Sequence, residues 1–278
     1  MNILICGSSG FVGNELRTYF QAKGNNVLGL RVREGTTIEN ISKQVEGVDI
    51  LINLAGVSIF SRWTQSYKKS LYNSRIDTTK KLVKAISLCH NKPRMFISTS
   101  AVGIYKNEEY SDENSGYGTS YLSKICKDWE DEAFKTNIPT TIFRFGVVLG
   151  KNGGMLQKMW LPFFLGLGGI IGSGKQSLSW IHIYDLCKAY EHIIENDLEG
   201  VYNLCSPLPT SNQELTKTLA GLMKRPSVFP VPAFMIRLIF SEGASFILEG
   251  QRVRPKHLLA KGFKFKYTSI QDALKSFI

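Results

Sequence analysis

The chain has 278 residues, of which 43% are hydrophobic and 21% charged, and a formal net charge of +11. This composition is typical of a globular protein with a large core, either one large α/β domain or a domain with a smaller lobe. The five cysteines are widely spaced and include no C-x-x-C pair, a pattern that indicates neither a disulfide framework nor a zinc site, so we expect no metal. No charged leader precedes the first apolar stretch, so we expect a cytoplasmic protein with no membrane partner.

The positive charge is spread over the chain. It includes helix faces such as Lys80, Lys81 and Lys84, and its densest part, from Arg252 to Lys266, is interrupted by apolar residues. Diffuse charge of this kind sets solubility more often than function, so no nucleic-acid partner is expected. The apolar run from Met159 to Ile171 is too short to span a bilayer and predicts a buried loop or pocket wall.

Strand-like and helix-like stretches alternate along the chain. We expect strands near residues 2–6, 27–31, 48–53, 94–99, 140–146 and 200–204, and helices near residues 11–23, 64–90, 119–136 and 184–196. Apolar strands separated by helices indicate an α/β fold, a Rossmann-type doubly wound parallel sheet. Only 17 residues, Val32 to Val48, separate the second strand from the third, so that part of the sheet is abbreviated.

The first strand leads directly into a G-x-x-G-x-x-G turn. Gly7 permits the tight bend, Gly10 lets backbone amides approach a pyrophosphate, and Gly13 allows the next helix to pack closely. The alternative is a merely structural corner between a strand and a helix. The dinucleotide contacts expected from this turn are Gly7, Ser9, Gly10, Phe11, Val12 and Gly13.

The second strand ends in Leu30-Arg31, where an acidic residue would indicate NAD. A guanidinium at Arg31 suits the extra phosphate of NADP, and the alternative is a solvated loop arginine. At the ends of the next two strands, small residues let a cofactor lie against the backbone. The contacts expected there are Leu54, Ala55, Gly56, Ser98 and Thr99.

Beyond Gly150 the chain changes to glycine-rich loops, prolines and short helices such as Ala233 to Phe240. We therefore expect an NADP-binding Rossmann domain over residues 1–150. Residues 151–278 are expected to be a mixed region that contributes late sheet elements and a small C-terminal substrate lobe over the crevice.

Four segments in this order resemble the extended short-chain dehydrogenase/reductases, the group of NAD(P)-dependent epimerases and dehydratases. They are the glycine turn, N-L-A-G at 53–56, S-T-S-A-V-G at 98–103 and F-R-F-G-V-V-L-G at 143–150. Further segments, among them Arg62-Trp63, Asp128-Trp129-Glu130 and Gly153-Gly154, are similar to the branch of epimerase-like proteins sometimes labelled cell-division-inhibitor-like. For that branch, NADP binding is the usual expectation. The resemblance adds Arg75 and Val147 as cofactor contacts; alternatively, Arg75 pairs with Asp77 or Glu130.

Working members of this superfamily use a serine or threonine and a Tyr-x-x-x-Lys pair that exchanges protons with a carbonyl or alcohol. Ser100 matches the serine, although it is equally suited to cap a helix. When the chain is aligned on Glu130, Leu122 stands at the tyrosine position and Cys126 at the lysine position.

Tyr121 and Lys124 lie three residues apart, on adjacent helix turns, and are candidates for a displaced acid/base pair. Tyr117 is a further candidate, and the alternative is that the pair is absent. His182 is expected to brace the substrate lobe.

We expect an NADP-binding oxidoreductase or epimerase that transfers hydride at a carbonyl or alcohol carbon of an unidentified small-molecule substrate, a sugar nucleotide being one candidate. The alternative is a non-catalytic, redox-sensing or regulatory NADP-binding protein. A monomer or homodimer is expected.

Overall fold

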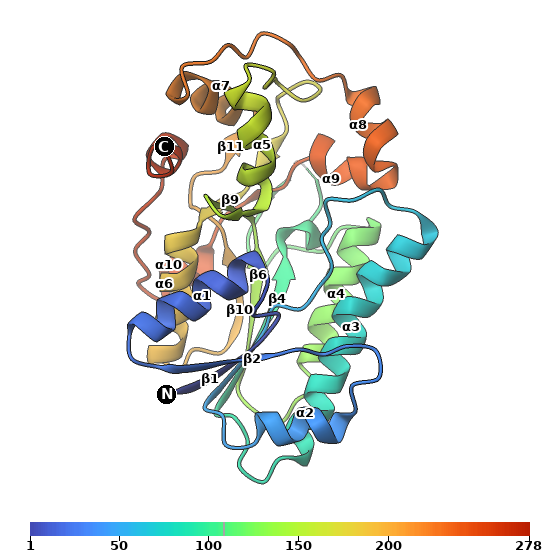
Figure 1. Cartoon of the computed structure of the whole chain (residues 1–278), viewed down its shortest axis with the longest axis vertical. Coiled ribbons are helices and arrows are strands. Elements are labelled where there is room, and N and C mark those ends of the chain that lie inside the picture. Colours follow the sequence, from blue (N-terminus) through green and yellow to red (C-terminus); the bar gives the residue numbers. More distant parts are fainter. Residues whose placement is uncertain (108) are drawn as a thin grey trace.

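The computed structural model describes residues 1–107 and 109–278. Within these residues, six parallel strands form one sheet in the order β10-β6-β4-β3-β1-β2 (Figure 1). The strands are β1 (Asn2–Cys6), β2 (Asn26–Leu30), β3 (Ile50–Asn53), β4 (Met95–Ala101), β6 (Thr140–Phe145) and β10 (Gly200–Leu204). The predicted Rossmann-type α/β fold is confirmed.

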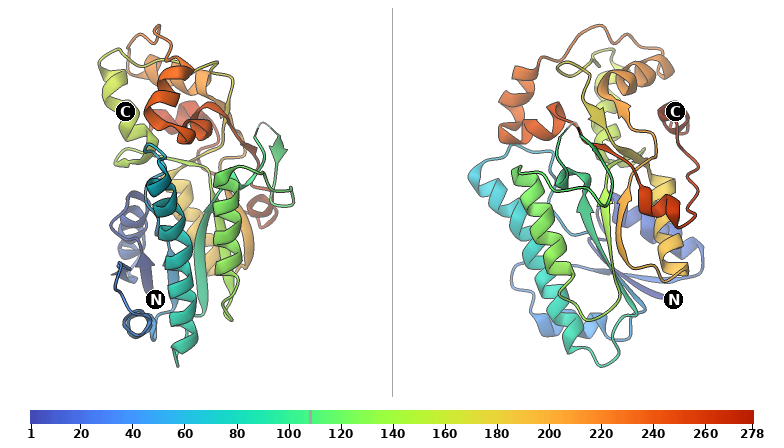
Figure 2. Two further views of the ribbon diagram at one scale, coloured as in Figure 1. Left: turned by 90° about the vertical axis from the view of Figure 1, so that its right-hand side faces the viewer. Right: turned by 180° about the vertical axis from the view of Figure 1, so that it is seen from behind.

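Helices cover both faces of the sheet, as Figure 1 and Figure 2 show. One layer contains α1 (Phe11–Ala22), α6 (Ile183–Glu195) and α10 (Lys256–Ala260), and the other contains α2 (Ile38–Val45), α3 (Gln65–Leu88) and α4 (Tyr121–Ala133). In β1, Ile3 and Ile5 pack toward the first layer, and Leu4 and Cys6 toward the second. Both faces of the strand are buried because side chains alternate along it.

The sheet is abbreviated at its β2 edge, as expected. Between β2 and β3 the described chain contains α2 and no further strand paired with β2. Thr37 caps α2, because its hydroxyl accepts a hydrogen bond from the amide of Asn40 at 3.3 Å.

The strand register brings the predicted motifs to one edge of the sheet. Cys6 is paired with Leu30 on one side and Asn53 on the other, and Asn53 is paired with Ser98. The residues that follow these strands therefore leave the sheet together, at the carboxyl edge where ligands bind in such folds.

The expected strand near residues 140–146 is β6, and the segment F-R-F-G-V-V-L-G at 143–150 is not one continuous strand. The chain separates at Gly146, and β7 (Val147–Gly150) pairs with β9 (Trp180–His182) instead of continuing in the main sheet. A Cβ atom at Gly146 would lie 2.6 Å from the Ser179 carbonyl oxygen. The close approach of these two backbones ends the first strand.

Most of the remaining elements form a smaller lobe at one end of the long axis, opposite α2 (Figure 1). Its helices are α5 (Gly154–Phe164), α7 (Asn212–Leu222), α8 (Ala233–Phe240) and α9 (Ser245–Leu248), with α11 (Ile270–Lys275) packed on α7. Two-residue strands pair as β8 (Ser177–Leu178) with β11 (Thr210–Ser211), and β5 (Tyr110–Ser111) with β12 (Arg252–Val253). Single 3-10 turns are η1 (Val102–Ile104) and η2 (Glu242–Ala244).

The apolar run at 159–171 is not a buried loop throughout. Its first part is the end of α5, which turns Leu156 and Phe163 toward the core. Leu161, Phe164 and Leu165 therefore lie on the other faces and are exposed. No helix within the described residues is long and apolar enough to cross a membrane.

Candidate functional site

The glycine turn between β1 and α1 forms a tight backbone cradle. Gly7 has φ +90°, and a Cβ atom at Gly13 would lie 2.3 Å from the Gly7 carbonyl oxygen. Gly10 precedes α1 and has no side chain to cap it. The first amides of any helix have no partner within the helix, and here no side chain at Gly10 caps them. Together with the positive end of the helix dipole, these amides can bind a phosphate group. The residues present fit a dinucleotide pyrophosphate.

A second group of glycines holds the start of α1 in place, and from the sequence alone these glycines had no predicted role. The Phe11 ring packs against Gly150, Gly153 and Gly154. A Cβ atom at Gly153 would lie 2.4 Å from Phe11 Cγ. Glycine is required because the turn between β7 and α5 lies directly on the first residue of α1. Val147, a predicted cofactor contact, is the first residue of β7.

Arg31 directly follows β2, and its side chain is exposed. The Gly7 amide donates to the Leu30 carbonyl at 3.3 Å, so the glycine turn begins next to this arginine. Among the described residues, no hydrogen bond or ion pair involves the Arg31 guanidinium. The Arg31 guanidinium is therefore available to bind an anion at the β2 end of the cradle.

The N-L-A-G segment is held by the buried Asn53. Its side-chain amide donates to Thr79 Oγ1 at 2.8 Å, and its carbonyl oxygen accepts from the Ala55 amide at 3.2 Å. Trp129 Nε1 also donates to Thr79 Oγ1. This network fixes the backbone from Leu54 to Gly56 against α3 and α4.

Arg75 of α3 lies against Gly56. A Cβ atom at Gly56 would lie 3.0 Å from Arg75 Cζ, and the guanidinium lies 5.4 Å from the Trp129 ring centroid. Its hydrogen bonds go to the carbonyls of Leu71 and Val57, and burial lowers the pKa of Arg75. The alternative that Arg75 pairs with Asp77 or Glu130 is wrong, because no carboxylate pairs with it among the described residues.

Two hydroxyl groups at the end of β4 are buried without hydrogen-bond partners. They belong to Thr99 and Ser100, whereas Ser98 accepts a hydrogen bond from Asn53 at 3.4 Å. Ser100 does not cap a helix, since Ala101 precedes η1. Burial raises the pKa of the adjacent Cys126 thiol to about 11. The Ser100 hydroxyl therefore lies beside a thiol, which is a weak hydrogen-bonding group, and has no other partner at the carboxyl edge of the sheet.

The structure does not bring Tyr121 and Lys124 together. Tyr121 donates its hydroxyl proton to the Lys68 carbonyl at 2.9 Å, and the Lys124 amine pairs with Asp128 at 2.5 Å. The α4 side chains that face β4 and η1 include those of Leu122, Ser123 and Cys126, and Ser123 Oγ donates to the Ile104 carbonyl at 2.7 Å. A Cβ atom at Gly103 would lie 2.5 Å from Leu122 Cδ2.

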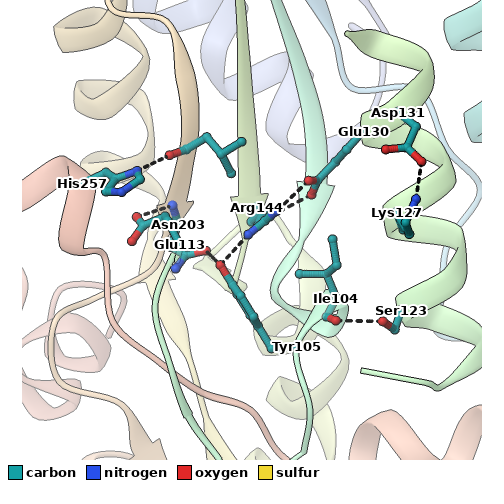
Figure 3. A network of polar contacts seen from close by, with 11 residues as sticks. Ile104, Tyr105, Glu113, Ser123, Lys127, Glu130, Asp131, Arg144, Asn203 and His257 are labelled. Carbon is teal, nitrogen blue, oxygen red and sulfur yellow. Dashed lines mark hydrogen bonds and ion pairs between the residues drawn. The ribbon is translucent and has the colours of Figure 1, made fainter. Parts of the chain in front are cut away.

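A buried polar network beyond these residues was not predicted (Figure 3). Arg144 of β6 donates to both carboxylate oxygens of Glu130, at 2.8 and 2.7 Å, and to the Tyr105 hydroxyl at 2.7 Å. Tyr105 donates in turn to Asn203. Burial alone would lower the pKa of Arg144, but hydrogen bonding to Glu130 raises it. The sequence feature that could have indicated this network is Arg144, the one charged residue in the strand segment T-T-I-F-R-F.

Tyr117 is close to this network, with Arg144 Cζ 5.5 Å from its half-exposed ring. His182 joins the end of the chain to the lobe. Its Nδ1 accepts from the Tyr184 amide, and its Nε2 contacts Ser276 Oγ at 2.9 Å. Its ring stacks on Tyr267 and Phe277.

Comparison with known proteins identifies the family. The model of the NAD dependent epimerase/dehydratase family matches residues 3–205, and a domain of unknown function, DUF1731, matches residues 231–277. The chain is 36% identical over 301 residues to the epimerase family protein SDR39U1 homolog, chloroplastic, of Arabidopsis thaliana, covering 99% of the chain and 86% of the relative.

Solved structures agree with this result. Human epimerase family protein SDR39U1, determined with NADPH, has a TM-score of 0.93 and 32% identity, covering 100% of this chain and 99% of the human one. UDP-glucuronic acid 4-epimerase from Bacillus cereus, determined with UDP-glucuronic acid and NAD, shares the fold, with a TM-score of 0.79 and 16% identity over 100% of this chain and 98% of that one. The predicted resemblance is confirmed: the chain belongs to the NAD dependent epimerase/dehydratase family.

Proposed function

We propose that the protein binds NADP and uses it as an oxidoreductase or epimerase, acting at a carbonyl or alcohol carbon of a small substrate. When bound, the cofactor supplies or accepts the hydride. The observation that carries the proposal is the unpaired Arg31 guanidinium beside a glycine cradle, where NAD-specific proteins have an acidic residue. The human relative determined with NADPH supports the same choice of cofactor.

Ser100 is proposed to hydrogen-bond the reacting oxygen of the substrate, because its buried hydroxyl has no protein partner. Arg75 is proposed to bind an anionic group of the cofactor or substrate, since it has no carboxylate partner among the described residues. With Tyr121 and Lys124 held by other partners, neither contacts Ser100, and we assign no proton-transfer role to that pair.

A second function is favoured by Leu122 and Cys126. These residues occupy the face of α4 that would present the tyrosine and lysine, and neither is a proton donor suited to neutral pH. A redox-sensing protein that binds NADP without turnover would retain the cradle and Arg31 but not the tyrosine–lysine pair.

Cytoplasmic location and the monomeric or homodimeric state stay predictions.

Fluorescence titration with NADPH and NADH, followed by NADPH oxidation with a panel of aldehydes and ketones, tests both functions. We expect tighter binding of NADPH and turnover that falls in Ser100→Ala and persists in Tyr121→Phe. Binding without turnover of any compound would favour the redox-sensing function. Binding of neither cofactor would contradict both functions.

A further inference from the structure

Helix α8 has its apolar face turned to solvent. Phe234, Met235, Leu238 and Ile239 share one face at helical spacing, and their side chains are between 43% and 68% exposed. Ile236 alone is buried. Contiguous exposed apolar surface of this kind marks an interaction site in a folded protein.

The exposed end of α5 and the segment before α8 extend this surface. The Val231 amide donates to the Ile170 carbonyl at 2.8 Å, and the Gly172 amide donates to the Val231 carbonyl at 2.9 Å. The Arg225 guanidinium lies 5.2 Å from the Phe164 ring centroid. Figures 1 and 2 place α5 and α8 at the same end of the molecule. We name the exposed apolar side chains of residues 161–167 and 228–239 the apical surface.

The two stretches of chain that form the apical surface carry only positive charge. Residues 155–176 and 221–241 contain five lysines and arginines and no aspartate or glutamate; the five are Lys158, Lys175, Lys224, Arg225 and Arg237. All five side chains are exposed. Within the described part of the chain, no ion pair neutralises any of them. The next carboxylate along the chain, that of Glu242, pairs with Lys68.

We propose that the apical surface binds peripherally to an anionic lipid bilayer. Apolar side chains flanked by lysine and arginine suit such an interface, where the former enter the acyl boundary and the latter meet anionic headgroups. A second copy of this chain is a poorer partner, because it would bring the same five cations into contact with one another. The proposal departs from the expectation, made from sequence alone, that no membrane partner exists.

Co-sedimentation of the full chain with lipid vesicles tests the proposal. We expect binding to vesicles of phosphatidylcholine mixed with phosphatidylserine, little binding to phosphatidylcholine alone, and weaker binding as salt increases. The double variant Phe234→Ser/Leu238→Ser should bind at least about ten-fold more weakly, because two large apolar side chains no longer enter the acyl boundary. Lys224→Glu/Arg225→Glu should also bind more weakly.

The matched control is Leu88→Ser/Phe134→Ser, which replaces two exposed apolar residues at the far ends of α3 and α4. It should bind vesicles like the parent chain, and circular dichroism should show that every variant is folded. Equal binding to both vesicle types, no binding, or an unchanged affinity in the folded α8 variant would overturn the proposal. So would a dimer in sedimentation velocity that only the α8 variant disrupts.

Discussion

At the scale of single residues, Arg31 is the side chain whose charge distinguishes the two nicotinamide cofactors. In Arg31→Asp, a carboxylate would replace the guanidinium beside the cradle and repel the extra phosphate of NADPH. We expect NADPH affinity to fall by roughly 10- to 100-fold, as for the loss of one charge-assisted hydrogen bond, and the preference over NADH to disappear. Paired fluorescence titrations measure both affinities.

Lys84→Asp on the exposed face of α3 is the control for Arg31→Asp, because it changes the net charge equally at a site remote from the turn. Its cofactor preference should match the parent chain. An Arg31→Asp variant that still prefers NADPH would remove Arg31 from the cofactor site.

Two serines of β4 give a matched test of the free hydroxyl. Ser98 and Ser100 are both buried, but only the Ser98 hydroxyl has a hydrogen-bond partner. Ser98→Ala should lower the free energy of unfolding by about 1–2 kcal/mol, and Ser100→Ala should change it by less than about 0.5 kcal/mol or raise it. Urea unfolding measures both changes. A larger loss in Ser100→Ala would show that its hydroxyl serves stability.

At the scale of elements, the Arg144–Glu130 pair links β6 to α4 (Figure 3). Glu130→Gln would leave the buried guanidinium without a counter-charge and should lower the free energy of unfolding by about 3–5 kcal/mol. The double variant Glu130→Met/Arg144→Met should be less destabilised than the single variant, because it buries no charge. Urea unfolding of the single variants Glu130→Met and Arg144→Met and of the double variant completes a double-mutant cycle that measures the coupling.

The Lys127–Asp131 pair on the same helix is exposed and serves as the control. Asp131→Asn should change the free energy of unfolding by less than about 1 kcal/mol, because water screens a surface pair. If Glu130→Gln were equally mild, the network would contribute little to holding β6 and α4 together.

The sheet was predictable from sequence because its strands are short apolar runs separated by helix-period patterns. The expected strands at 2–6 and 200–204 match β1 and β10 residue for residue. The strand β7 beyond Gly146 and its pairing with β9 were not predictable, since they depend on the approach of Ser179, which is distant in sequence. The exposed face of α8 was missed for a similar reason: apolar periodicity marks a face but does not show which way it points.

For the candidate site, the sequence predicted where the motifs lie but not how their side chains are paired. Motifs that immediately follow strands were located correctly, because strand register alone places them at one edge. The partners of Tyr121 and Lys124 could not be read from spacing, because Lys68 belongs to another helix and Asp128 competes on the same one. The packing of Phe11 on Gly153 likewise joins segments that are remote in sequence.

At the scale of the whole molecule, the end of the chain is held by two ionisable residues at the start of α6. Asp185 accepts hydrogen bonds from the backbone amides of Lys266 and Tyr267, each at 2.9 Å, and His182 contacts Ser276. Burial, together with a smaller effect of the nearby Lys266 charge, lowers the pKa of His182 to about 4. His182 is therefore neutral in the folded protein over a range where it is protonated when unfolded.

This difference predicts how stability depends on pH. Because the unfolded chain binds a proton at His182 below about pH 6.5 and the folded chain does so only near pH 4, the free energy of unfolding should fall as pH decreases through this window, by about 3 kcal/mol in total. Burial raises the pKa of Asp185, which contributes in the opposite sense. Hydrogen bonds from Lys188, Lys23 and Tyr19 outweigh burial and lower the pKa of Glu191 to about 2. Protonation of Glu191 therefore lowers the free energy of unfolding only as pH falls below about 4.5.

His182→Asn isolates the histidine contribution, because asparagine still caps α6 but does not titrate. Urea unfolding at a series of pH values between 7 and 4 should give a steeper loss of stability in the parent chain than in the variant. The two curves should converge toward the acid end, since His182 no longer favours folding there. Parallel curves would show that His182 has the same proton affinity in the folded and unfolded chain, and that the C-terminal segment is held without its neutral form.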